Sequence, residues 1–160
     1  MAGFTMTRSQ RGCLAFFLST TLFGFAASSQ TVKGFIGNGT AKRGVSTRGS
    51  IVLEIPHGLH VNSNKPNNEY LIPTVVQLTG SGVKITKVTY PRGSDRKFNF
   101  SEKKLNVYVG TIVFPFTVTV PKSFRGKNIS VHATIEFQAC TEEVCYPQRS
   151  EKVSITAAVR

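Results

Sequence analysis

The amino-acid sequence predicts an all-β protein that folds as an antiparallel β-sandwich, and three observations support this prediction. Apolar and polar residues alternate along several segments, Gly, Pro, Asn and Ser separate these segments, and no segment has the period of an amphipathic helix. The clearest alternation runs from Ile129 to Gln138. About eight strands in roughly 115 residues fit a single sandwich domain.

Each expected strand follows from its own local pattern. Residues 51–55, 112–120 and 153–159 place an apolar side chain at every second position, which gives a strand one buried face. Shorter apolar segments predict further strands at residues 59–62, 72–78, 83–89 and 105–109. The expected core contains Leu53, Ile55, Phe114, Phe116, Ile129, Val131, Ile135 and Phe137.

The first 29 residues have the layout of a secretory signal peptide. Arg8 and Arg11 precede an apolar run from Cys13 to Ala27, and small residues continue to Ser29. The apolar run is shorter than the ~20 residues that a membrane-spanning helix needs. We therefore expect residues 1–29 to be removed on export, and Cys13 with them.

The rest of the chain divides into a lead-in and one domain. Residues 30–48 are rich in glycine and are expected to form a flexible or edge-strand lead-in, and residues 49–160 are expected to form the domain. The protein is expected to be periplasmic or secreted, with no transmembrane segment after signal removal. Its net charge is then +10. The lysines and arginines are scattered and not interleaved with aromatic residues, so a solvated basic surface is favoured over nucleic-acid binding.

Cys140 and Cys145 are the two cysteines that remain after signal removal, with four residues between them. They can form a disulfide across a tight loop if their Cα atoms come within about 4.4–6.8 Å. Closing so short a loop stabilises a protein by only ~2 kcal/mol, and a domain of this length can build its own core without a staple. Exchange chemistry is therefore favoured, and a structural hairpin disulfide is the alternative.

The charged residues around the cysteines do not decide whether a reactive thiolate forms. Glu142 and Glu143 disfavour a thiolate, whereas Arg149 favours one. The cysteines and the three histidines, His57, His60 and His132, do not have the spacing of a zinc motif. No catalytic triad or phosphate-binding loop is recognisable either. We expect no metal and no cofactor, and hydrolase or transferase activity is disfavoured.

Four segments together resemble the N-terminal periplasmic domain of the thiol:disulfide interchange protein DsbD, a protein-disulfide reductase. They are Pro56–Asn62, Tyr90–Gly93, Val107–Gly110 and Phe137–Pro147. The last is the most specific, because a Phe-Gln-Ala-Cys lead and a Cys-Tyr-Pro exit flank the cysteine pair as they do in that family. The resemblance extends over about residues 45–158.

This resemblance implies an immunoglobulin-like sandwich that carries a redox-active disulfide. Cys140 and Cys145 would accept electrons from a thioredoxin-like donor and pass them to oxidised envelope proteins. An aromatic cap shields the pair in the family, and Phe98 or Phe100 would supply it here. The expected cap and site-lining residues are Phe98, Phe100, His60, Asn62 and Tyr146.

Other roles stay open for these side chains. His60 and Asn62 fall where the family places tyrosines, but a histidine in a strand is commonly exposed. Phe98 and Phe100 could belong to ordinary packing, and Tyr146 could simply set the turn after the loop. A second function for the whole chain is also open, that of a non-catalytic immunoglobulin-like binding module with a structural disulfide.

Three features depart from the family pattern. The best-known members have five residues between the cysteines, where this chain has four. Arg96 and Lys97 stand near the expected cap, where those members have acidic residues. The chain ends at Arg160 without membrane segments or a thioredoxin module, so the electron donor is expected in trans.

Overall fold

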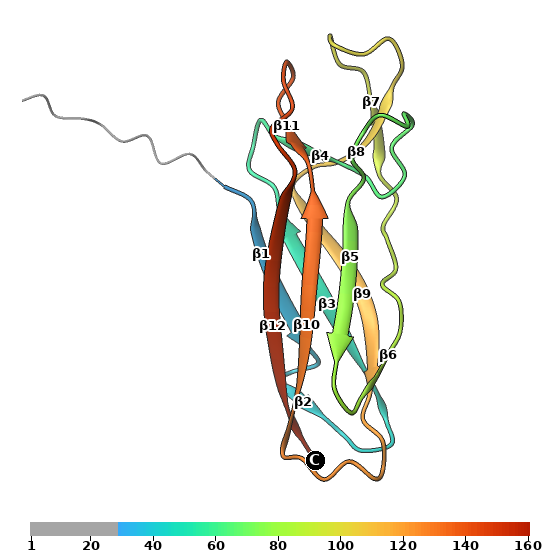
Figure 1. The fold of residues 1–160 in the computed structure, drawn as a ribbon, viewed down its shortest axis with the longest axis vertical. Coiled ribbons are helices and arrows are strands. Elements are labelled where there is room, and N and C mark those ends of the chain that lie inside the picture. Colours follow the sequence, from blue (N-terminus) through green and yellow to red (C-terminus); the bar gives the residue numbers. More distant parts are fainter. Residues whose placement is uncertain (1–28) are drawn as a thin grey trace, which may run out of the picture.

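The structure is a computed structural model that describes residues 29–160. Figure 1 shows a long two-layered β-structure with a smaller group of strands at one end. The described residues contain strands and no helix, which confirms the all-β prediction. None of them forms a helix that could span a membrane. The expected signal peptide lies, except for Ser29, outside the described residues.

The first sheet has four strands in the order β1-β3-β9-β6. All of its pairs are antiparallel, and the register sets Ile51 opposite Phe114 and Leu53 opposite Ile112. The strands are β1 (Thr31–Ile36), β3 (Ser46–Glu54), β6 (Lys84–Ile85) and β9 (Thr111–Thr119).

The second sheet has the order β2-β12-β10-β5. Its centre is the long antiparallel pair of β10 and β12, and only β2 runs parallel to its neighbour. The strands are β2 (Thr40–Ala41), β5 (Val75–Gly80), β10 (Asn128–Phe137) and β12 (Arg149–Val159).

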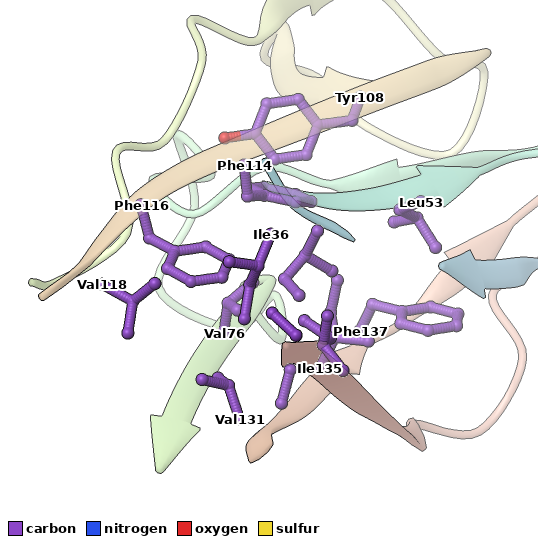
Figure 2. Close-up of a cluster of buried hydrophobic side chains, with 14 of the residues drawn as sticks. Ile36, Leu53, Val76, Tyr108, Phe114, Phe116, Val118, Val131, Ile135 and Phe137 are labelled. Carbon is purple, nitrogen blue, oxygen red and sulfur yellow. The ribbon is translucent and has the colours of Figure 1, made fainter. Parts of the chain in front are cut away.

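The main core lies between these two sheets. Figure 2 shows side chains of β9, such as Phe114 and Phe116, facing side chains of β10, such as Val131 and Ile135. Alternate positions of both strands are buried, as expected for strands with one face on a core. All of the core residues expected from the sequence are buried, namely Leu53, Ile55, Phe114, Phe116, Ile129, Val131, Ile135 and Phe137.

A third, smaller sheet lies at the end drawn at the top of Figure 1. One of its faces joins the main core through Val61, Tyr108 and Ala139, and the other packs under a separate cluster that contains Phe98. This sheet is therefore covered on both faces. Its strands, in the order β11-β4-β8-β7, are β4 (His60–Asn62), β7 (Ser94–Arg96), β8 (Leu105–Tyr108) and β11 (Ala139–Cys140).

One strand is shorter in the structure than the sequence analysis expected. The strand expected at residues 83–89 is reduced to Lys84–Ile85, because the chain beyond it follows β9 without a regular ladder. The backbone N–H of Thr117 donates to the side-chain hydroxyl of Thr86 and not to a backbone carbonyl, and the proline at position 115 has no N–H to donate. Residues 30–48, expected as a flexible or edge-strand lead-in, hold the edge strands β1 and β2 and the start of β3.

Candidate functional site

Cys140 and Cys145 form a disulfide at the tip of a hairpin that follows β10. They face each other as an antiparallel bridge, between the backbone hydrogen bonds Tyr146 N to Ala139 O and Thr141 N to Val144 O. Their Cα atoms are 3.9 Å apart, closer than the interval expected from the sequence. Side chains in such a non-hydrogen-bonded pair lie closest together, so the hairpin itself brings the sulfurs together.

The turn between the cysteines is organised by Thr141. Its hydroxyl oxygen accepts hydrogen bonds from the backbone N–H groups of Glu143 and Val144, at 3.2 and 3.1 Å. Threonine makes such local bonds readily, and they fix a short turn without glycine. Glu142, Glu143 and Val144 are exposed, so the turn presents two carboxylates and an apolar side chain to solvent.

The two sulfurs differ in accessibility. Cys140 has no exposed surface, whereas Cys145 is exposed. Thiol-disulfide exchange requires an attacking thiolate to reach a sulfur along the line of the S–S bond, so access limits the reaction. Cys145 is the more exposed of the two residues, and an attack on its sulfur would make Cys140 the leaving sulfur.

His60 lies directly beside the buried cysteine. It is paired with Cys140 in the β4–β11 ladder, and its side chain is 3% exposed. A turn from Pro56 to Leu59, with Gly58 at φ 81°, brings the chain into β4 at this point. Burial, and next the positive charge of Arg96, lower the pKa of His60 to about 4. The imidazole is therefore neutral near pH 7, and the exposed-histidine alternative is wrong.

Asn62 and Gln138 connect the same face of β4 to the far side of the hairpin. Asn62 is fully buried and donates from Nδ2 to Ile72 O at 3.0 Å and to Gln138 Oε1 at 3.3 Å. Gln138 in turn donates to Tyr146 O at 3.1 Å. These bonds fix the base of the hairpin against β4. Tyr146 enters the network only through its backbone, and its side chain is 47% exposed.

Phe98 covers the face of the small sheet on which Cys140 lies. Its ring is 2% exposed, stacks on His60 with ring centroids 4.2 Å apart, and packs with Leu105 and Val107. Side chains directly opposite in neighbouring strands share a face, so His60 places Phe98 and Cys140 on the same side of the sheet. Phe100 stacks on the outer side of Phe98 at 5.4 Å and is 42% exposed.

Lys97, one of the basic residues near Phe98, has local partners. Lys97 donates from Nζ to Ser101 O and Glu102 O, both at 2.6 Å, which closes the loop that carries the two aromatic rings. At its base, Asp95 accepts hydrogen bonds from Asn106 and Asn67, and the bond from Asn106 contributes most to lowering its pKa. The loop is thus held by lysine and backbone carbonyls.

Two hollows flank the hairpin. One, of about 570 Å³, is lined by His60, Arg96 and Glu142 among others. The other, of about 440 Å³, has apolar walls from Leu59, Ala139 and Tyr146. Arg149 lines the second hollow but is ion-paired with Glu151, so less of its charge is available to a thiolate than the sequence suggested. Within residues 29–160, no three His, Cys, Asp or Glu side chains gather as a metal site.

Comparison with protein families assigns most of the chain to a known family. Residues 38–157 match the family described as thiol:disulfide interchange protein DsbD, N-terminal. The chain belongs to the DsbD N-terminal domain family. The match confirms the resemblance found in the sequence and includes both cysteines, together with His60, Asn62 and Phe98. No curated protein is similar enough to the chain to count as a match.

A solved structure supports the fold. The N-terminal periplasmic domain of ScsB from Proteus mirabilis is similar over 80% of this chain, with a TM-score of 0.51 and 14% sequence identity. This chain covers 45% of that structure, so it corresponds to less than half of its length. Together with the family match, the similarity confirms the immunoglobulin-like sandwich expected from the sequence.

The structure brings most of the expected site residues to one end of the sandwich. One face of the small sheet carries Cys140, His60 and Asn62, and the ring of Phe98 covers this face. Phe100 joins the group by stacking on Phe98. Sequence reasoning missed the linking role of Gln138 and the turn-forming role of Thr141. A threonine followed by two polar residues between cysteines was the available signal for the turn. Nothing in the sequence marks Gln138 as a bridge to Asn62.

The packing of Phe98 gives a prediction about access to the cysteines. Replacing Phe98 and Phe100 together with alanine should speed the alkylation of the reduced cysteines by iodoacetamide, because it uncovers the face that holds Cys140. The rate is measured by mass spectrometry in the folded protein. The control is Phe124→Ala, which removes a partly buried ring from the loop between β9 and β10, at the other end of the sandwich. Equal alkylation rates in all three proteins would show that Phe98 does not cap the pair.

Proposed function

We propose that this chain is an exported thiol-disulfide interchange domain that relays electrons from a thioredoxin-like donor to oxidised envelope proteins. The observation that carries the proposal is the asymmetry of the disulfide, with Cys145 exposed and Cys140 fully buried. A purely structural clip has no need of an exposed sulfur beside a covered one. Membership of the DsbD N-terminal family supports the same chemistry.

The exchange proceeds in two substitutions at sulfur. A donor thiolate attacks Sγ of Cys145, the Cys140–Cys145 bond breaks, and Cys140 leaves with the electron pair and takes up a proton. The donor's second thiolate then attacks the donor sulfur of the mixed disulfide and releases Cys145, which also takes up a proton. The donor dithiol loses two electrons and two protons, and the cysteine pair gains them. Transfer to an oxidised client follows the same steps in reverse.

The surroundings of the hairpin support docking of a protein partner at Cys145. Val144 and Tyr146 are exposed on either side of it, at 54% and 47%, and the apolar hollow beside Tyr146 adjoins them. A partner placed there would contact apolar surface while its thiolate meets the exposed sulfur. Phe98 blocks a partner from approaching the disulfide through the face of the small sheet that holds Cys140.

We further propose that residues 1–29 direct export and that the mature protein works in the periplasm or outside the cell, where its donor is a separate protein. The arginines and apolar run of this segment support the proposal. The mature protein would then begin at residue 30, with β1 built from the lead-in.

A coupled assay tests the relay. Oxidised protein is mixed with thioredoxin, thioredoxin reductase and NADPH, while near-ultraviolet circular dichroism monitors the fold. We expect stoichiometric NADPH consumption with the fold intact, and none with the Cys140→Ser/Cys145→Ser variant. If the disulfide resists thioredoxin until the protein is denatured, the relay is wrong, and a binding module with a structural disulfide takes its place.

A further inference from the structure

Opening the disulfide creates a charge where water cannot reach. When Cys145 is attacked, the electron pair of the broken S–S bond goes to Cys140, which is fully buried. A thiolate is disfavoured in such a place unless a neighbour donates a hydrogen bond or a proton. The reaction therefore needs a group beside Cys140 that can supply a proton and, in the reverse direction, remove one.

His60 is positioned to be that group. It lies directly opposite Cys140 in the β4–β11 pair, and such pairs have Cβ atoms about 4.5–5.5 Å apart with both side chains on one face. The stack with Phe98 holds the imidazole ring in place at 4.2 Å. An imidazole is both a donor and an acceptor in its neutral form, so it can serve either direction of the exchange.

The second observation is an unused hydrogen-bonding atom. Nε2 of His60 is buried and has no hydrogen-bond partner among the described residues. The residue as a whole is only 3% exposed. Buried polar atoms are rarely left unpaired, and an exception asks for an explanation. In the disulfide form, the sulfur of Cys140 carries no proton to offer. Reduction turns that sulfur into a donor or a charged acceptor, and either form can pair with the imidazole.

The same histidine also connects the buried sulfur to the surface. The residue is among those that line the hollow of about 570 Å³ beside the hairpin, and its strand pairs with that of Cys140. The charged and titratable groups that face it there are His57 from the preceding turn, Arg96 from β7 and Glu142 from the hairpin. Protons can enter the hollow from solvent, and His60 is the titratable residue that lies between the hollow and Cys140.

We propose that His60 carries the proton of Cys140 during thiol-disulfide exchange. When the disulfide opens, one ring nitrogen gives its proton to the departing sulfur while the other takes up a proton from solvent in the hollow, so the ring stays neutral. When Cys140 must attack a mixed disulfide, the relay runs in reverse: one nitrogen takes the thiol proton and the other releases a proton to the hollow. The proposal rests on the exchange function proposed above, but its tests use the chain alone, so failure of either one is distinguishable from failure of the other.

The first test measures the pKa of Cys140 in the reduced protein. In the protein without residues 1–29, and so without Cys13, Cys145→Ser leaves a single thiol. Its thiolate absorbance is followed against pH with and without His60→Phe, a change that keeps a stacked ring and removes both nitrogens. We expect the pKa to rise by about one unit or more in the absence of the imidazole, and alkylation at neutral pH to slow about tenfold. His132→Phe, on the exposed side of β10, is the matched control and should change neither. An unchanged Cys140 pKa in His60→Phe overturns the proposal.

The second test needs no substitution at His60, and it decides the case if His60→Phe does not fold. The imidazole nitrogen signals of His60 are followed by NMR through the pH range in which Cys140 ionises, in the Cys145→Ser protein and in the oxidised wild type. We expect an inflection at the Cys140 pKa in the single-thiol protein and none in the disulfide form. Imidazole signals that do not respond to ionisation of Cys140 overturn the proposal.

Discussion

Cys140→Ser should convert the chain into a covalent trap for its electron donor, whereas Cys145→Ser should not. The first variant keeps the exposed cysteine and the second keeps the buried one. The probe is a thioredoxin whose resolving cysteine is replaced and whose remaining cysteine is activated as a mixed disulfide with thionitrobenzoate. The thiolate of Cys145 attacks the thioredoxin sulfur, thionitrobenzoate leaves with the electron pair, and the protein-protein disulfide persists because no second cysteine resolves it.

Two readouts follow the trapping reaction. Release of thionitrobenzoate gives the rate, and non-reducing electrophoresis gives the yield of the complex. We expect rapid, near-complete capture by Cys140→Ser and little by Cys145→Ser. The two variants should react alike after denaturation, which shows that burial causes the difference. Faster capture by folded Cys145→Ser would reverse the assignment of the attacked sulfur.

The long strands could be predicted from the sequence because each is buried on one face only. Along β9 and β10 every second residue meets the opposite sheet, so the alternation of residue types records the burial directly. The shortest strands leave no such record. All three residues of β7 are exposed, and β2 and β11 are only two residues long. Their pairing is decided by neighbours distant in the sequence.

The site shows the same limit at His60. All three residues of β4 are buried, because the main core covers one face of the strand and the Phe98 loop covers the other. A strand covered on both sides loses its alternation, so the sequence left an exposed histidine open as an alternative. The cysteine hairpin was easier to predict, since both cysteines and the turn between them are local. The position of Phe98 over β4 depends on the closure of its loop by Lys97, which no sequence motif announces.

The wild-type protein should lose about 3 kcal/mol of stability through His60 alone as the pH falls from about 6.5 to about 4. The imidazole has a pKa of about 4 in the folded protein, and histidine in an unfolded chain has a pKa near 6.5. Between these values the unfolded state binds the proton and the folded state does not. The stabilising effect of the neutral histidine is therefore complete above pH 6.5, and it is lost as the pH falls.

Urea unfolding of wild type and His60→Phe between pH 4 and 7 isolates this contribution. Glu54 and Asp95 also have lowered pKa values, through hydrogen bonds from Lys33 and Asn106 respectively. Both proteins keep these carboxylates, so their effects cancel in the difference in stability between wild type and His60→Phe. We expect the wild type to lose about 3 kcal/mol more stability than His60→Phe over this range. Burial of the imidazole contributes most to the effect. Arg96 adds to it by opposing protonation, and Glu142 across the hollow would favour protonation. Parallel curves for the two proteins would mean that burial does not hold the imidazole of His60 neutral.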